Sequence, residues 1–189
     1  MPMYVLYGEV FEAWAEGYGG RPEAARSEMR RKIARWREKV GTLYNPLFDA
    51  ALAKIESASG DIVAALATID QAVATCERTG QRWYDAELHR IRGEILIKQN
   101  PADPAPGEAA FLAAIAVAQQ QKARSFALRA ALSLAKLYQS TGRAIDAHDI
   151  LCMALEGFAP TPEFPEIAET LSVLSSIEPS AQGSRSSGF

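Results

Sequence analysis

The stretch LRAALSLAKLYQSTGRAIDAHDILCMAL, residues 128–155, decides the fold of this chain. It contains two alanine-rich segments with apolar residues at helical spacing, joined by a short turn that includes Gly142. Alanine is the best helix former, and its small side chain lets two helices approach closely. A glycine ends a helix at little cost because it adopts a left-handed conformation readily. The stretch therefore predicts two antiparallel helices packed as a hairpin.

The same pattern recurs around other glycines. Alanine occurs seven residues before Gly142, five residues after it and twelve residues after it. Gly60 has alanine at the same three offsets. Gly20 has the first two alanines, but Lys32 occupies the third offset. In each copy the residue seven before the turn glycine is the small residue of the first helix. A fourth copy has Gly93 as its small residue, and a proline-rich connection replaces its turn glycine. The four small residues are spaced by 40, 40 and 42 residues: Ala13, Ala53, Gly93 and Ala135.

One hairpin cannot bury its own apolar stripe, so repeated hairpins stack into a solenoid. The sequence predicts an all-α, tetratricopeptide-like solenoid of about four hairpins with a C-terminal capping helix. We expect a single repeat domain over residues 1–178 and a disordered tail over 179–189, which is polar and rich in small residues. The expected elements are hairpins at 2–40, 45–79, 83–121 and 124–157, and a capping helix at 163–177.

Local signals refine these boundaries. Asn45 and Asp61 are expected to cap the helices that follow them, since their side chains accept hydrogen bonds from free helical N–H groups. Gly41 and Gly80 are expected just past second helices. Cys76 follows the apolar stripe of its helix and is expected in the core.

The composition restricts the class of protein. Of the 189 residues 48% are hydrophobic and 23% charged, as in a globular protein, and the formal net charge of −3 gives no basic excess for nucleic acid or anionic lipid. Two cysteines make no disulfide framework. Glu9 and Glu12 interrupt any secretory apolar core, and no apolar run is long enough to span a membrane. We expect a cytoplasmic protein with neither a nucleic acid nor a membrane as its partner.

The residues Leu134, Ala135, Tyr138, Gly142 and Ala147, with Leu151 and Ala154 after them, resemble a tetratricopeptide repeat, although the spacing of about 40 exceeds the usual 34. Longer runs are similar to one bacterial group, the C-terminal repeat region of multidomain signalling proteins. In that group a class III adenylate/guanylate cyclase or a helix-turn-helix domain precedes a signal-transduction ATPase module, which precedes the repeats. The similar runs are ARWREKVGTLYNPLFDAALA (34–53), GQRWYDAELHRIRGEIL (80–96), QQQKARSFALRAALSLAKLYQSTGR (119–143) and EGFAPTPEFPEIAETLSVL (156–174).

This resemblance implies a sensing or docking module without chemistry of its own. The catalytic and nucleotide-binding parts of such proteins precede the repeats, and this sequence contains neither a phosphate-binding glycine loop nor the paired aspartates of a cyclase metal site. No catalytic residue, metal ligand or cofactor is therefore predicted. The expected partner is a protein or a peptide.

In tetratricopeptide arrays a concave groove is lined by the residue after the small position of each first helix and by the residues about one and two turns before it. Here that geometry predicts a surface with aromatic groups near its N-terminal end and basic groups further along, suited to a peptide with an acidic group. An ordinary solvated face with pairs such as Arg90–Glu94 is the alternative. The candidate groove residues are Tyr7, Trp14, Lys54, Arg90, Glu94, Arg129 and Lys136.

Two other functions and one association remain open. His148 and Cys152 share a helix face and could begin a small enzyme site or a metal site, although the sequence offers no third ligand for them or for His89. RNA binding by helical repeats is the second alternative, but the basic run at 30–39 alternates with apolar residues as an amphipathic helix does. The apolar start of the first helix, around Tyr4, predicts self-association of the chain.

Overall fold

The computed structural model of the chain describes residues 2–158 and 164–177, which form nine helices and no strand. The all-α prediction is confirmed. The predicted disordered tail at 179–189 and the first residue of the predicted capping helix lie outside the described residues. The helices are α1 (Met3–Tyr18), α2 (Pro22–Lys39), α3 (Asn45–Ala58), α4 (Ile62–Thr79), α5 (Asp85–Gln99), α6 (Ala105–Gln120), α7 (Arg124–Ser140), α8 (Ala144–Leu155) and α9 (Pro165–Ile177).

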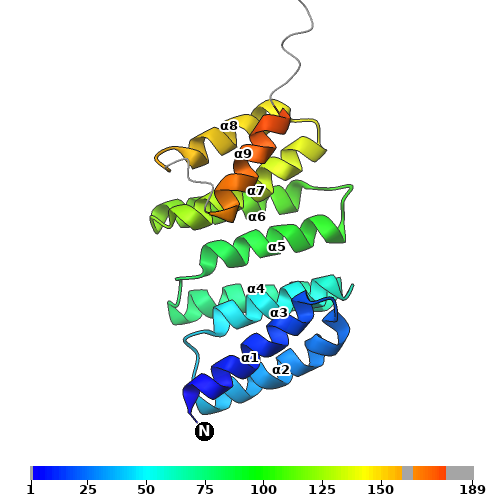
Figure 1. Ribbon diagram of the computed structural model, residues 1–189, viewed down its shortest axis with the longest axis vertical. Coiled ribbons are helices and arrows are strands. Elements are labelled where there is room, and N and C mark those ends of the chain that lie inside the picture. The colour runs from blue at the N-terminus through cyan, green and yellow to red at the C-terminus, as the bar shows by residue number, and fades with distance from the viewer. Residues whose placement is uncertain (1, 159–163, 178–189) are drawn as a thin grey trace, which may run out of the picture.

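Consecutive helices pack as antiparallel pairs that stack along one axis. Figure 1 shows α1 and α2 at one end of the stack and α8 and α9 at the other, with the remaining helices between them. Helix α9 packs on α7 and α8 in the position that the first helix of a further hairpin would take. The structure thus has the predicted arrangement of four hairpins and a capping helix.

The array curves toward its first helices. Each first helix contacts the next, from α1 with α3 to α7 with α9, whereas no contact joins α2 with α4, α4 with α6 or α6 with α8 in the part of the chain described. Because the first helices approach one another more closely than the second helices do, they lie on the inner side of the curve. We call the surface formed by α1, α3, α5 and α7 the inner face.

Glycines form the turns where the repeat register predicts them. The φ angles of Gly20, Gly60 and Gly142 are +92°, +86° and +77°, in the left-handed region that L side chains rarely adopt. Gly41 and Gly80 adopt positive φ after α2 and α4, as expected. After α6 the corresponding turn contains no glycine, and Lys122 takes the left-handed conformation instead.

The two predicted caps have different outcomes. Asp61 accepts a hydrogen bond from the Ala64 N–H at 3.1 Å and caps α4, as predicted. The prediction for Asn45 is wrong, because Asn45 is the first helical residue of α3 and its side chain caps no N–H group. Pro46 follows in the first turn, where its missing N–H leaves one fewer donor to satisfy.

The core consists of three apolar clusters along the stack. The N-terminal cluster is aromatic, with Trp36 and Phe48 fully buried between α1, α2 and α3. The middle and C-terminal clusters are aliphatic and rich in alanine, and Cys76 is buried in the middle one, as predicted. The small residues Ala13, Ala53, Gly93 and Ala135 are all buried. Among the described helices, none combines the length and the hydropathy that crossing a membrane requires.

Candidate functional site

The predicted groove residues all belong to the helices of the inner face. At its N-terminal end Tyr7 and Trp14 are half-buried in a chain of rings rather than standing free. The Tyr7 ring centre lies 4.6 Å from that of Phe11, and Phe11 lies 5.1 Å from Trp14. The Trp14 indole Nε1 is buried and has no hydrogen-bond partner in the described part of the chain. These two residues therefore form the wall of the inner face and leave little polar capacity for a ligand.

Lys54 lies beyond this wall, on α3. Its Nζ is 5.0 Å from the centre of the Tyr18 ring, and no carboxylate pairs with it within the described residues. A pocket of about 220 Å³ opens beside it, lined by Gly17, Tyr18, Lys54, Ile55 and Ala58. The Gly17 position has to be small, because a Cβ there would lie 2.7 Å from Cγ1 of Ile55. This is a cation beside an aromatic ring, open to an incoming anion.

Arg90 forms the Arg90–Glu94 pair that the sequence offered as the alternative, but the arginine is buried rather than solvated. It is buried and donates from Nε and Nη2 to the Glu87 carboxylate, at 3.0 Å each, and from Nη1 to Glu94 at 2.5 Å. Arg129 of α7 also reaches Glu87, at 3.0 Å. Glu87 is itself fully buried, so this network joins α5 to α7 and holds charges that would be costly to leave unpaired. Arg90 and Arg129 already have their anionic partners within the fold.

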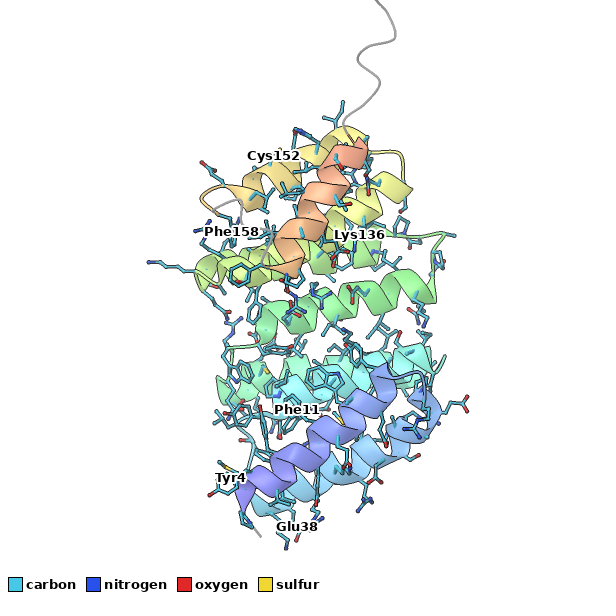
Figure 2. The ribbon with its side chains drawn as sticks, in the orientation of Figure 1. Tyr4, Phe11, Glu38, Lys136, Cys152 and Phe158 are labelled. Atoms are coloured by element: carbon cyan, nitrogen blue, oxygen red, sulfur yellow. The ribbon has the colours of Figure 1, made fainter. Side chains whose placement is uncertain are left out.

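Lys136 lies at the C-terminal end of the inner face. Its Nζ pairs with Glu169 of α9 at 2.5 Å, and both side chains are about half exposed. Figure 2 shows Lys136 beside α9, far from Tyr4 and Glu38 at the opposite end of the stack. Lys136 and Glu94 line a second pocket of about 290 Å³ between α5 and α7. The sequence predicted both charged residues but not the apolar floor between them, which is Ile97, Phe111 and Leu137.

Gly93 is the sequence signal that points to this floor. A Cβ on Gly93 would lie 2.5 Å from Cε1 of Phe111, so the glycine is what lets the Phe111 ring of α6 lie against the backbone of α5. A glycine in the interior of a helix is costly unless something packs against it. A glycine inside a predicted helix therefore indicates that another helix packs closely there. The repeat spacing does not identify Phe111 as the residue that packs against it.

The structure brings His148 and Cys152 together on α8. The Cys152 Sγ lies 3.6 Å from His148 Nε2, and His148 Nδ1 lies 3.2 Å from Asp149 Oδ1. Cys152 is exposed on α8, at the α8–α9 end of the stack in Figure 2, and it is not among the residues that line the α5–α7 pocket. No group of three or more His, Cys, Asp or Glu side chains that could hold a metal ion occurs in residues 2–158 and 164–177. The third ligand that the sequence lacked is not supplied by the fold of these residues.

Two further titratable side chains, those of His89 and Cys76, are packed within the stack. His89 is half-buried on α5, where loss of solvation lowers its pKa. Burial raises the pKa of the Cys76 thiol to about 12, with the nearby Asp85 carboxylate adding to the shift, so the thiol is held in its unreactive protonated form.

The basic run at 30–39 forms the solvated side of α2, as predicted. Its apolar members Ile33 and Trp36 face the core. Its charged members pair with carboxylates: Arg30 with Glu56, Arg31 with Glu28, Lys32 with Glu12, Arg35 with Glu9, Arg37 with Asp49 and Lys39 with Glu38. The pairs with Glu9 and Glu12 tie α2 to α1 and those with Asp49 and Glu56 tie it to α3, whereas the other two pairs lie within α2.

Comparisons with known proteins agree with the fold. No family model matches the chain, and no curated protein matches it. Two solved structures of a putative kinesin light chain with nearly identical TPR-like repeats, from Podosopora anserina, are similar to it. A variant of that protein has a TM-score of 0.69 at 14% identity, covering 94% of this chain and 87% of that chain. The other has a TM-score of 0.65 at 14% identity, covering 98% and 99%. This likeness shows a tetratricopeptide-like fold.

Proposed function

We propose that this chain is a protein- or peptide-binding repeat module that docks a partner along its inner face. The observation that carries the proposal is Lys54, a partly exposed cation beside the Tyr18 ring, next to a pocket, with no carboxylate partner among the described residues. Most other cations of the inner face already have acidic partners in the fold. A carboxylate of the partner would form a charge-assisted hydrogen bond with Lys54.

An acidic helix already meets cations of α7 within the chain itself, where α9 continues the stack. Helix α9 has two glutamates and no basic residue, and it brings Glu166 to 4.0 Å from Arg129 and Glu169 to Lys136. At this end of the inner face the first-helix cations therefore meet an acidic segment. The same chemistry at Lys54 supports an acidic segment of a partner protein rather than a nucleic acid.

The bacterial signalling proteins that the sequence resembles supply the proposed setting. We infer that the module acts in the cytoplasm as a non-catalytic sensing or docking scaffold for an ATPase- or cyclase-type protein, with no cofactor. Size-exclusion chromatography with light scattering, run on the chain with and without the ATPase or cyclase encoded beside it, tests this. A mass equal to the complex is expected on mixing.

A charge reversal assigns the binding surface. Lys54→Glu is expected to abolish the complex, whereas Lys39→Glu, at an exposed lysine on α2, is expected to leave it intact. Lys39 pairs with its neighbour Glu38 and lies outside the inner face, so it matches Lys54 in charge but not in place. A complex that survives Lys54→Glu would refute docking at this face, and no complex with any neighbour would refute the proposed setting.

Self-association concerns a different surface, the start of α1. Met3, Tyr4 and Val5 are exposed there, with Tyr4 at 74%, whereas Gly8 and Glu12 occupy the next turns. We propose that any self-association uses this first turn, because the residues at the same face in the next two turns, Gly8 and Glu12, offer no apolar side chain to a second copy. Tyr4→Ser is expected to abolish concentration-dependent growth in mass by light scattering, and growth that persists in this variant would exclude the first turn.

A further inference from the structure

The pocket between α5 and α7 has an apolar floor and charged walls. Ile97, Phe111 and Leu137 form the floor, and Glu94, Ser133, Lys136 and Ser140 surround it. Its volume of about 290 Å³ is near the lower end of the range for small-molecule pockets, which suits a small ligand. An apolar floor with a small number of polar and charged groups placed around it is typical of a small-molecule site.

The two charged walls retain hydrogen-bonding capacity. Glu94 Oε1 accepts from Arg90 and from the Ser133 hydroxyl, at 2.5 and 3.3 Å, and Oε2 accepts no hydrogen bond from the described residues. Lys136 donates to Glu169, which leaves two of the three ammonium donors without a partner in the described part of the chain. The side chains of Glu94 and Lys136 are 42% and 51% exposed. Glu94 pairs with Arg90 and Lys136 pairs with Glu169, so the two do not pair with each other. One wall thus offers an acceptor and the other offers donors.

Two other junctions of first helices in the array differ from this pocket. The pocket between α1 and α3 has Lys54 at the repeat position of Lys136, but Trp14 stands at the position of Glu94. At the junction of α3 and α5, the Lys98 ammonium donates to the Ser57 carbonyl oxygen and crosses the corresponding space. Lys54 and Glu94 hold the two equivalent positions at that junction, so what distinguishes the pocket between α5 and α7 is the apolar floor between its acidic and basic walls.

We propose that this pocket binds a free amino acid with an aliphatic side chain. The ammonium group of the ligand donates to Glu94, its carboxylate accepts from Lys136, and its side chain covers the floor at Ile97, Phe111 and Leu137. A zwitterion matches the two walls at once, because its opposite charges are joined through one carbon. This ligand goes beyond the partner protein proposed above, since it needs neither Lys54 nor a peptide chain.

Three analogues of leucine test each part of this arrangement by isothermal titration of the whole chain. Leucine is expected to bind, and N-acetylleucine, which has no ammonium group, and leucinamide, which has no carboxylate, are each expected to bind at least tenfold more weakly. Glycine, which has both charges but no side chain, is expected to show no binding. Absence of leucine binding, or equal binding of either blocked analogue, would overturn the proposal.

Variants locate the site. Glu94→Gln keeps the size of the side chain and removes its charge, Lys136→Gln removes the charge with a slightly shorter side chain, and each is expected to weaken leucine binding at least tenfold. Glu38→Gln, at an exposed glutamate on α2, is the matched control and is expected to bind leucine as the unchanged chain does. Circular dichroism confirms that each variant is folded. Binding that both pocket variants retain would place the ligand elsewhere and refute the site, while leaving the protein-docking test with Lys54→Glu unaffected.

Discussion

In the first hairpin the space around the helices is filled by large rings, whereas in the third hairpin two helices meet through glycines. Trp36 of α2 is 1% exposed, and its ring centre lies 5.3 Å from that of Phe48 on α3. In the third hairpin a Cβ added to Gly93 or to Gly107 would lie 3.1 Å from the backbone oxygen of the other glycine. The same repeat geometry is reached by adding side-chain volume in one place and by removing it in the other.

The difference shows which errors each hairpin tolerates. An aromatic seam fails when volume is lost, because the rings around the gap cannot all move into it. A glycine seam loses stability when volume is added, because the backbones of the two helices are already in contact and cannot move apart without disturbing the packing around them. The glycine seam also leaves the Phe111 ring at the floor of the α5–α7 pocket, so close packing of the third hairpin and formation of that pocket depend on the same residue.

The largest effect is expected from removing volume in the first hairpin. Trp36→Ala should lower the free energy of unfolding by about 3–5 kcal/mol, because it leaves a cavity among buried rings. Urea denaturation measures the loss. Trp83→Ala is the matched control: Trp83 is 41% exposed at a turn, and its loss should cost about 1 kcal/mol or less. Equal losses for the two variants would show that the aromatic seam does not carry the stability of the first hairpin.

Adding volume in the third hairpin comes next. Gly93→Ala should lower the free energy of unfolding by about 1–3 kcal/mol, because the new methyl group meets Phe111. Adding Phe111→Leu should recover part of that loss in a double variant.

Gly8 provides the control for this prediction. It lies on the exposed side of α1, and an added Cβ there meets nothing within 4 Å. Gly8→Ala should therefore stabilise the chain by roughly 0.5–1 kcal/mol. A loss at Gly8 equal to that at Gly93 would contradict the distinction between the hairpins.

One repeat position carries a tyrosine in both hairpins, and its environment differs. Tyr4 and Tyr84 each lie nine residues before the small residue of their first helix, and Tyr84 contacts Phe126 of the next hairpin with ring centres 5.8 Å apart. Burial, together with the Glu87 charge, raises the pKa of Tyr84 to about 12 from its usual 10. The folded chain therefore keeps a proton that the unfolded chain loses, and this stabilisation is present below pH 10 and disappears between pH 10 and 12.

Alkaline unfolding tests this assignment. At about pH 11 the unchanged chain should have lost roughly 1 kcal/mol of stability relative to Tyr84→Phe, which has no proton to release. Tyr4→Phe, which removes an exposed hydroxyl at the same repeat position, is the control for the substitution itself. Identical alkaline slopes for Tyr84→Phe and the unchanged chain would show that Tyr84 is not the group responsible.

The sequence predicted the repeat more fully than the site. Fixed offsets from Gly20, Gly60 and Gly142 identified the turns and the buried small residues, because both depend on the absence of a side chain at one position. The partners of charged residues depend instead on which helices become neighbours. Arg129 reaches Glu87 and Lys136 reaches Glu169 across hairpins, at separations of 42 and 33 residues that no local pattern specifies. The position of Lys54 beside the Tyr18 ring, with no carboxylate partner among the described residues, depends on the same geometry between neighbouring helices.

The smallest effect concerns the turn that follows each of the two hairpins. Gly41 ends the first and Lys122 ends the third, and both have positive φ, at +129° and +57°. A lysine pays a steric cost there that glycine does not, although glycine loses more backbone entropy on folding. Lys122→Gly should therefore raise the free energy of unfolding by about 0.5–1 kcal/mol in urea. Lys122 is exposed, so lost packing does not obscure the result. The reverse control, Gly80→Lys at φ +74°, should destabilise the chain by a similar amount. Destabilisation by Lys122→Gly would mean that the lysine side chain makes a contribution at this turn larger than its backbone strain.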